Sequence, residues 1–291
     1  MINVYAVMAH AMPEQLAALI DRLLPPGSAD RVVLHLDARS TLWRHQRERF
    51  ASHPSGRLTL IEQPLKVLWG HYSQVDCQRP LLRAALAEPF DYVHLISGAD
   101  WPACPLPQIA RDIAAYGERR PVFTDLWGEL QLNRMDDWWF EHPKINLTDV
   151  LRLNENIARA QVRASWALTR WGKKLGLKRS TYEGQPWMKG SSWYSVPQDA
   201  ARVLLAEYDR LMGEGRLRFT QCADEHVAPS VFARNFADRI EPARRYIDWS
   251  GNASHPKLLR AQDEGAIRQS GAWFARKCDA RVDDFFLRLP A

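Results

Sequence analysis

The acidic pair Asp224-Glu225 is the stretch of this sequence best suited to acid–base chemistry. It follows Cys222-Ala223 and precedes His226-Val227-Ala228, where a short helix is predicted to begin. A carboxylate serves as a general base when it lies within hydrogen-bond reach of a substrate hydroxyl. The alternative role is structural, because the macrodipole of a helix stabilises an ionised acid in its first turn. Glu225 is therefore the candidate base.

A basic pair, Arg276-Lys277, follows the apolar run 272–275 near the end of the chain. A short strand there would aim two cations at one site, whereas the alternative is a solvated Arg-Lys pair. No two aspartates are separated by a single residue, and neither a G-x-x-x-x-G-K-S/T loop nor a G-x-G-x-x-G fingerprint occurs. If a nucleoside diphosphate is bound, basic side chains must neutralise it in place of Mg²⁺ or Mn²⁺. The sequence thus predicts no metal site and no cofactor.

Polar residues follow three predicted strands in the first third of the chain. His10, Asp37 and Asp100 each come shortly after an apolar or β-branched run, and Ser97-Gly98 forms a turn before Asp100. Ligands of open α/β sheets bind at the carboxyl ends of the strands, so these three residues are candidates for a nucleotide site. The alternative is a structural histidine and solvated aspartates in ordinary turns.

Tryptophan is abundant, with twelve in 291 residues. Five of them sit beside Gly, Ser or Pro at predicted turns, where an aromatic face can stack on a sugar ring or a base: Trp69, Trp101, Trp187, Trp193 and Trp249. The alternative role of each is to anchor the core or a loop.

The elements that must position these residues alternate between strand and helix. Predicted strands cover 2–8, 32–36, 58–61, 92–96, 121–125, 192–196 and 272–275. Predicted helices cover 13–24, 41–50, 73–87, 105–116, 148–175, 197–212 and a short stretch after Asp224, and Pro80 predicts a kink or early break in the third. Residues 127–140 have no clear period and are interpreted as a surface loop. The alternation favours an α/β fold with a mostly parallel central sheet flanked by helices, in one domain over 1–291.

The net charge of +5 is concentrated in one segment. Residues 151–179 carry eight basic side chains and one acid, a net +7, which leaves −2 for the rest of the chain. Nucleic-acid binding through an overall positive field is therefore disfavoured. The predicted helix in this segment is amphipathic and basic, so it either docks on an anionic membrane surface or anionic glycan, or presents a solvated outer face.

The apolar runs, the N-terminal residues and the cysteines indicate the cellular compartment of the protein. No run of about 18 apolar residues exists, and the chain begins as a strand without a secretory signal. The four cysteines, Cys77, Cys104, Cys222 and Cys278, form no C-x-x-C pair, which argues against structural zinc and a disulfide framework. We expect a cytoplasmic protein with reduced cysteines. Docking through 151–179 would make it peripheral to the inner membrane.

These motifs together resemble one family, the core-2/I-branching β-1,6-N-acetylglucosaminyltransferases and peptide O-xylosyltransferases (glycosyltransferase family 14), in a bacterial-type form. The matching pieces occur in family order: Ala9-His10, Val33–Ser40 (VLHLDARS), Val67–Ser73 (VLWGHYS), Tyr92–Pro102 (YVHLISGADWP), Lys189–Trp193 (KGSSW), Asp224-Glu225, Arg245–Trp249 (RYIDW) and Phe274–Lys277 (FARK). They span nearly the whole chain. The animal members carry a membrane anchor and several disulfides, which this sequence does not show.

The resemblance implies a GT-A-like fold and inverting, metal-independent transfer from a UDP-sugar. It makes Glu225 the catalytic base and places Lys277, with Arg276, on the donor diphosphate. It also assigns Asp37 to the nucleotide site and Trp249 to the acceptor side. The full set of candidate donor or nucleotide residues is His10, Asp37, Trp69, Gly70, Asp100, Arg276 and Lys277. The candidate acceptor or sugar residues are Asp224, Ser192, Trp193 and Trp249.

The sequence therefore favours a glycosyltransferase that moves a sugar, GlcNAc or xylose by analogy, to a hydroxyl of a glycan, glycolipid or polysaccharide. The alternative is a protein that binds a nucleotide sugar or carbohydrate on the same fold without catalysis, because every proposed catalytic residue could also serve binding.

Overall fold

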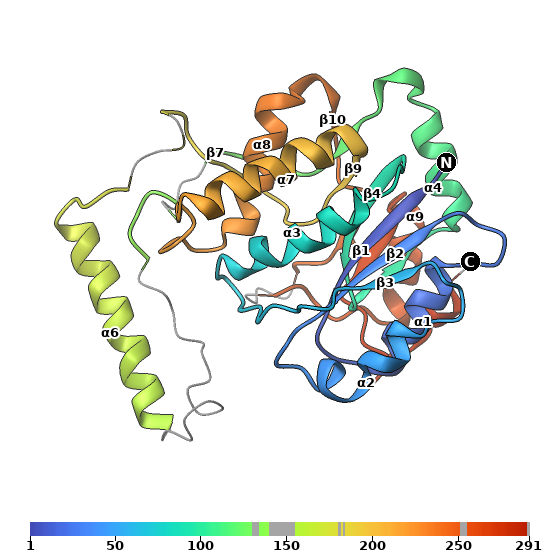
Figure 1. Cartoon of the computed structure of the whole chain (residues 1–291), viewed down its shortest axis with the longest axis horizontal. Helices are drawn as coiled ribbons and strands as arrows, with labels where there is room; N and C mark the ends of the chain where they lie inside the picture. Colours follow the sequence, from blue (N-terminus) through green and yellow to red (C-terminus); the bar gives the residue numbers. More distant parts are fainter. Residues whose placement is uncertain (130–133, 140–154, 180–181, 183, 251–254, 290–291) are drawn as a thin grey trace.

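The central sheet has seven strands in the order β10-β6-β9-β4-β1-β2-β3 (Figure 1). The computed structural model describes residues 1–129, 134–139, 155–179, 182, 184–250 and 255–289. Six strands of this sheet run in one direction, and β9 is antiparallel to its neighbours β4 and β6. The strands are β1 (Asn3–Ala9), β2 (Arg31–Leu36), β3 (Leu58–Leu60), β4 (Tyr92–Ser97), β6 (Val122–Phe123), β9 (Ser195–Pro197) and β10 (Ile240–Glu241). The predicted α/β fold with a mostly parallel sheet is confirmed.

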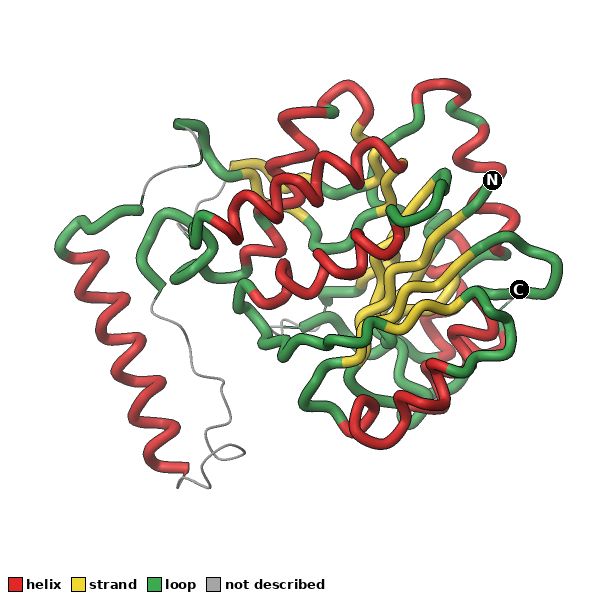
Figure 2. Tube along the Cα trace, viewed as in Figure 1, coloured by secondary structure: helices red, strands yellow, loops and turns green. Residues whose placement is uncertain are grey.

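Helices cover both faces of this sheet (Figure 2) because successive strand residues point to opposite faces. In β1, Val4 and Ala6 pack in one core with residues of α3, α7 and α8, whereas Tyr5 and Val7 pack in a second core with residues of α1, α2 and α4. The helices are α1 (Pro13–Leu23), α2 (Thr41–Ala51), α3 (Ser73–Ala85), α4 (Leu106–Ala114), α6 (Glu155–Lys174), α7 (Gln198–Gly213), α8 (Val227–Asn235) and α9 (Glu264–Gln269). Short 3-10 helices cover Gly117–Arg119, Ala223–Glu225, Ala237–Arg239, Ala261–Asp263 and Phe285–Arg288.

A second sheet of three strands carries the basic pair. Its order is β11 (Arg245–Ile247), β12 (Phe274–Arg276) and β5 (Asp100–Pro102), with β12 antiparallel to β5. The predicted strand before Lys277 is thus confirmed as β12. Asp100 was expected in a turn beyond β4, but it begins β5, where the register places it opposite Arg276.

Two further expectations are corrected. Helix α3 runs through Pro80 to Ala85 without the predicted early break, because Val75, Leu81 and Leu82 on its inner face are fully buried and hold it on the sheet. Residues 127–140 are not only loop: β7 (Leu126–Glu129) pairs antiparallel with β8 (Met188–Gly190), while 130–133 and 140 lie outside the described residues. Because β7 has four residues and pairs with a strand about sixty positions later, no periodic pattern in the local sequence indicates it.

The basic helix predicted over 148–175 is α6, and 148–154 lie outside the described residues. It projects beside the body instead of covering the sheet (Figure 1), and its apolar Leu168, Trp171 and Leu175 are exposed. No helix in the described ranges combines the length and apolar character that crossing a membrane requires. Cys77, Cys222 and Cys278 are buried, and all four cysteines are free thiols, as predicted.

Gly190 lies where the chain leaves no room for a side chain. A Cβ at this position would lie 2.2 Å from the carbonyl oxygen of Asp125 and 2.8 Å from Cγ of Pro229. The amide of the next residue, Ser191, donates to the same Asp125 oxygen at 2.9 Å. The segment that follows β8 is therefore held tightly between β6 and α8.

We expect Gly190→Ala to lower the free energy of unfolding by about 1–3 kcal/mol, because backbone and a proline ring must shift to admit the methyl group. Urea denaturation measures this difference. Gly213→Ala is the matched control, since Gly213 ends α7 and a Cβ there meets nothing within 4 Å. Equal midpoints for the two variants would contradict the tight packing at Gly190.

Candidate active site

Two carboxylates and an arginine form an acidic cluster beside α8. Cys222 adopts a left-handed conformation, and the 3-10 turn Ala223–Glu225 that follows directs the two acids differently. Asp224 is 5% exposed and accepts a hydrogen bond from Oγ of Ser192 at 2.6 Å. The Glu225 side chain is 31% exposed, and one of its carboxylate oxygens pairs with Nη1 of Arg134 at 2.8 Å. Glu225 is therefore the more accessible of the two acids.

Burial separates the protonation behaviour of the groups in this cluster. Loss of solvent, followed by the charge of Glu225, raises the pKa of Asp224 to about 6. Burial lowers the pKa of His226 to about 4. Because Nδ1 of His226 donates to the carbonyl oxygen of Cys222 at 2.8 Å, its Nε2 carries no proton. Neighbouring carboxyl groups in different environments are the usual means of giving two acids two roles.

The basic pair forms a second group, which is centred on a buried guanidinium. Arg276 is 6% exposed, its Nε lies 3.5 Å from Oδ1 of Asp100, and its Cζ lies 3.9 Å from the centroid of the Trp193 ring. Among the described residues, Nε and Nη1 of Arg276 have no hydrogen-bond partner. Burial lowers the pKa of Arg276, and burial followed by the charge of Arg276 lowers the pKa of Lys277, which is half-buried. Both are desolvated cations, Arg276 has unpaired N–H groups, and an anion would stabilise them.

The consecutive residues Ser192 and Trp193 join the two groups. The hydroxyl of Ser192 donates to Asp224 in the acidic cluster, whereas the indole of Trp193 lies against Arg276. The segment that connects β8 to β9 therefore places a carboxylate and a buried cation on the two sides of one dipeptide. This juxtaposition can serve a reaction that removes a proton at one point and stabilises negative charge at another.

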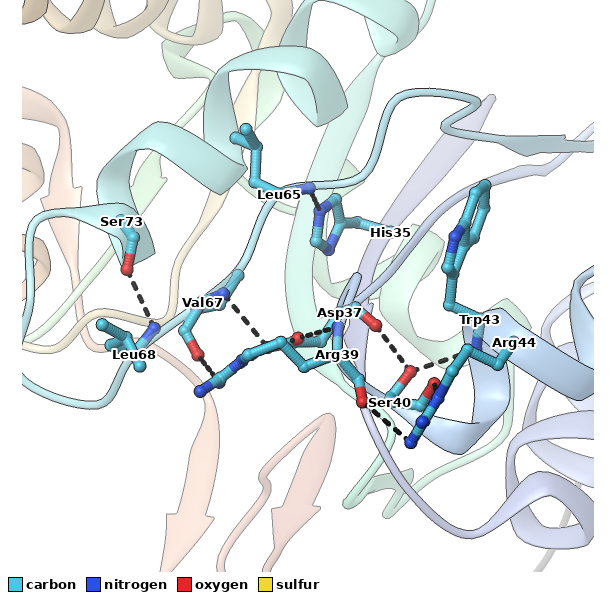
Figure 3. Close-up of polar contacts among 10 residues, drawn as sticks. All are labelled: His35, Asp37, Arg39, Ser40, Trp43, Arg44, Leu65, Val67, Leu68 and Ser73. Carbon is cyan, nitrogen blue, oxygen red and sulfur yellow. Dashed lines mark hydrogen bonds and ion pairs between the residues drawn. The ribbon is translucent and has the colours of Figure 1, made fainter. Parts of the chain in front are cut away.

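Asp37 organises the segment that leads from the sheet toward the acidic cluster (Figure 3). Its carboxylate accepts hydrogen bonds from the backbone amide of Arg39 at 2.8 Å and of Val67 at 3.1 Å, and it pairs with the Arg39 guanidinium. The ring of His35, two residues earlier in β2, accepts from the amide of Leu65 at 2.8 Å, so Nε2 of His35 is unprotonated. Burial accordingly lowers the pKa of His35 to about 4. Figure 3 shows Ser73 holding the amide of Leu68 in the same segment.

Gly70 carries this segment to the acidic cluster. Its φ of 73° lies in the left-handed region, and its carbonyl oxygen accepts from the amide of Cys222 at 2.8 Å. A path of hydrogen bonds and short chain segments therefore leads from Asp37 through 67–70 to the Asp224 turn. From there it continues through Ser192-Trp193 to Arg276.

The structure unites most, but not all, of the predicted site residues. Glu225, Asp224, Ser192, Trp193, Asp100, Arg276, Lys277, Asp37 and Gly70 lie on the path just described. His10 is exposed beyond β1, and Trp69 and Trp249 are 60% and 51% exposed. Trp101 and Trp187 are buried and pack in the two hydrophobic cores, which agrees with the structural alternative for these two residues. Within the described ranges, no three His, Cys, Asp or Glu side chains are grouped so as to hold a metal ion.

Arg134 is the residue of this site that the sequence did not reveal. It lies in the stretch interpreted as a surface loop, ninety-one positions before its partner Glu225. Its carbonyl oxygen also accepts from the amide of Gln221 at 3.0 Å, which fixes it beside the acidic turn. No local pattern marks such a pairing. The one feature of the sequence that could have drawn attention to Arg134 is that it is a basic residue within a tryptophan-rich stretch.

Comparisons with known proteins give no family for this chain. No protein-family model and no curated protein sequence matches it. A solved structure described as 4-diphosphocytidyl-2C-methyl-D-erythritol synthase is similar, with a TM-score of 0.38 and 11% sequence identity, over 92% of this chain and 99% of that one.

The raised pKa of Asp224 predicts a specific pH dependence of stability. Because the folded protein holds this proton up to about pH 6, the contribution is present below the unfolded value near 4 and is lost as the pH rises through 6. The parent should lose up to about 3 kcal/mol of unfolding free energy between pH 4 and 7 that Asp224→Asn does not lose. Urea denaturation across this range measures the difference. Parallel curves for parent and variant would contradict the assignment.

Proposed function

We propose that this protein is a metal-independent, inverting glycosyltransferase that uses a UDP-sugar donor. One observation carries the proposal: a buried guanidinium with unpaired N–H groups, Arg276, is connected through Ser192-Trp193 to a solvent-accessible carboxylate, Glu225. A diphosphate leaving group supplies the anion that the first group needs, and an acceptor hydroxyl supplies the proton that the second can take. The resemblance in motif order to the family 14 transferases supports the same reaction.

In the proposed reaction, Glu225 takes the proton from an acceptor hydroxyl. The acceptor oxygen then forms a bond to the anomeric carbon from the face opposite UDP, and the bond between that carbon and the diphosphate oxygen breaks. Its electron pair stays on UDP, where Arg276 and Lys277 stabilise the charge. The configuration at the anomeric carbon is inverted, and Glu225 afterwards releases its proton to water. Asp224, which is inaccessible and more easily protonated, orients Ser192 in this scheme.

Donor and acceptor are further proposals. The resemblance favours GlcNAc or xylose as the transferred sugar and a glycan, glycolipid or polysaccharide as the acceptor. Trp69 and Trp249 present exposed indole faces suited to stacking on sugars.

One contact favours a second candidate function. The ion pair between Arg134 and Glu225 occupies a carboxylate oxygen that a substrate hydroxyl would otherwise reach. A protein that binds a nucleotide sugar without turnover would keep this pair, whereas a transferase must open it as the acceptor binds. Release of UDP from a UDP-sugar separates the two candidates.

We expect Glu225→Gln to lower the rate of UDP release by roughly 10²-fold or more, because the amide cannot accept the acceptor proton. The assay uses a panel of UDP-sugars with a mixture of glycan acceptors, with and without EDTA. Glu118→Gln, at an exposed position in the 3-10 helix Gly117–Arg119, is the control. Near-normal turnover in Glu225→Gln would overturn the role of Glu225. UDP release abolished by EDTA would overturn the metal-independent reaction.

Lys277→Met should weaken UDP binding by about 10-fold to 100-fold, since it removes one charged hydrogen bond to the diphosphate. Titration calorimetry with UDP measures this change. The side chain of Lys277 is half-buried, so its loss should leave the fold intact. Arg281→Met, four residues later and exposed, is the matched control and should bind UDP as the parent does. If Lys277→Met and Arg281→Met bind UDP with equal affinity, the diphosphate does not contact Lys277.

A further inference from the structure

Helix α6 contacts the rest of the protein along one side. Lys173 pairs with Asp137 at 3.3 Å and lies 4.2 Å from the centroid of the Trp139 ring, and the Trp166 ring meets Trp139 edge to face. Thr169, between them on the helix surface, is 4% exposed. These positions recur every three or four residues, so they form one side that rests on the segment 134–139.

The nearly opposite side of α6 is apolar and uncovered. Leu168, Trp171 and Leu175 share it, at 52%, 61% and 67% exposure. Exposing a contiguous group of large apolar side chains to water costs free energy. An apolar surface of this kind indicates a binding surface for a partner or a membrane. Leu177, just beyond the helix, is 53% exposed and extends the same apolar character.

A basic stripe lies along this apolar side. Arg163, Arg170 and Lys174 are exposed and fall on one line at spacings of seven and four, and Nζ of Lys174 lies 5.6 Å from the centroid of the Trp171 ring. The occupant of the surface must therefore offer apolar contact and negative charge together. A second copy of α6 would bring equal positive charges face to face, which disfavours self-association.

We propose that α6 docks the protein on a membrane surface rich in anionic lipids. Leu168, Trp171 and Leu175 insert at the level of the headgroups, while Arg163, Arg170 and Lys174 contact lipid phosphates. An amphipathic helix with basic and apolar side chains binds a membrane interface by lying in its plane. Among the described residues, the contacts of α6 with the body lie along its other side. The site at Glu225 is thereby kept close to lipid-linked acceptors or donors.

Sedimentation with vesicles tests the proposal, using phosphatidylcholine alone and phosphatidylcholine with one quarter phosphatidylglycerol, in 0.15 M NaCl. The parent should bind the anionic vesicles at least tenfold more tightly than the neutral ones. Arg163→Gln, Arg170→Gln and Lys174→Gln together should weaken that binding by about a hundredfold. Leu168→Ser, Trp171→Ser and Leu175→Ser together should weaken it tenfold or more. Each triple changes only exposed side chains, and the two act independently.

Matched controls change the same kinds of exposed side chain on other elements. Arg47→Gln, Arg111→Gln and Arg202→Gln remove equal charge, and Val203→Ser, Leu258→Ser and Leu287→Ser remove exposed apolar groups. Both controls should bind as the parent does. The proposal is overturned if the parent does not bind anionic vesicles. It is also overturned if the control charge variant loses as much binding as the α6 charge variant, or if the α6 apolar variant binds as tightly as the parent. A dimer in solution that the apolar triple abolishes, without vesicle binding, would assign the surface to a second copy instead.

Discussion

A buried positive charge determines how the two sheets meet. Arg276 on β12 lies opposite Asp100 on β5, and the Trp193 ring covers its guanidinium face. On the next strand, Arg245 donates to the carbonyl oxygen of Tyr194 at 3.1 Å and to Oγ of Ser195 at 2.9 Å. The three-stranded sheet is thus fastened by two arginines to the segment that enters β9 of the central sheet. Removing one partner of a buried ion pair leaves a charge without compensation, so this junction tolerates little change.

Arg276 and Lys277, the two basic residues of the site, differ in how far they take part in this junction. Arg276 is needed for the packing of Trp193 and for the charge of Asp100, and only its remaining N–H groups are free for a ligand. Lys277 is half-buried, and its carbonyl oxygen accepts from the amide of Leu259 at 2.9 Å, while its ammonium group is not tied into the junction in the same way. Arg276 therefore has a structural role at the junction in addition to its unpaired N–H groups.

The sequence predicted the parts of this protein that depend on short stretches of chain. The strands β1, β2 and β4, the helices between them, and the delivery of Arg276 by a strand follow from apolar runs and caps that a window of ten residues contains. The prominence of Asp224-Glu225 follows from its position before a helix. The β7–β8 pair, the second sheet through Asp100 and the ion pair of Arg134 with Glu225 join residues tens of positions apart, and no local period records them. The amphipathic character of α6 was predictable, but which side it turns to the body was not, because that depends on Asp137 and Trp139.

The attachment of α6 has a mechanical consequence. The segment 134–139, on which the helix rests through Asp137 and Trp139, also begins with Arg134, whose guanidinium restrains Glu225. The same six residues therefore hold both α6 and the Glu225 carboxylate. A movement of α6 that displaces 134–139 changes the Arg134–Glu225 contact, and no strand of the central sheet lies on this path.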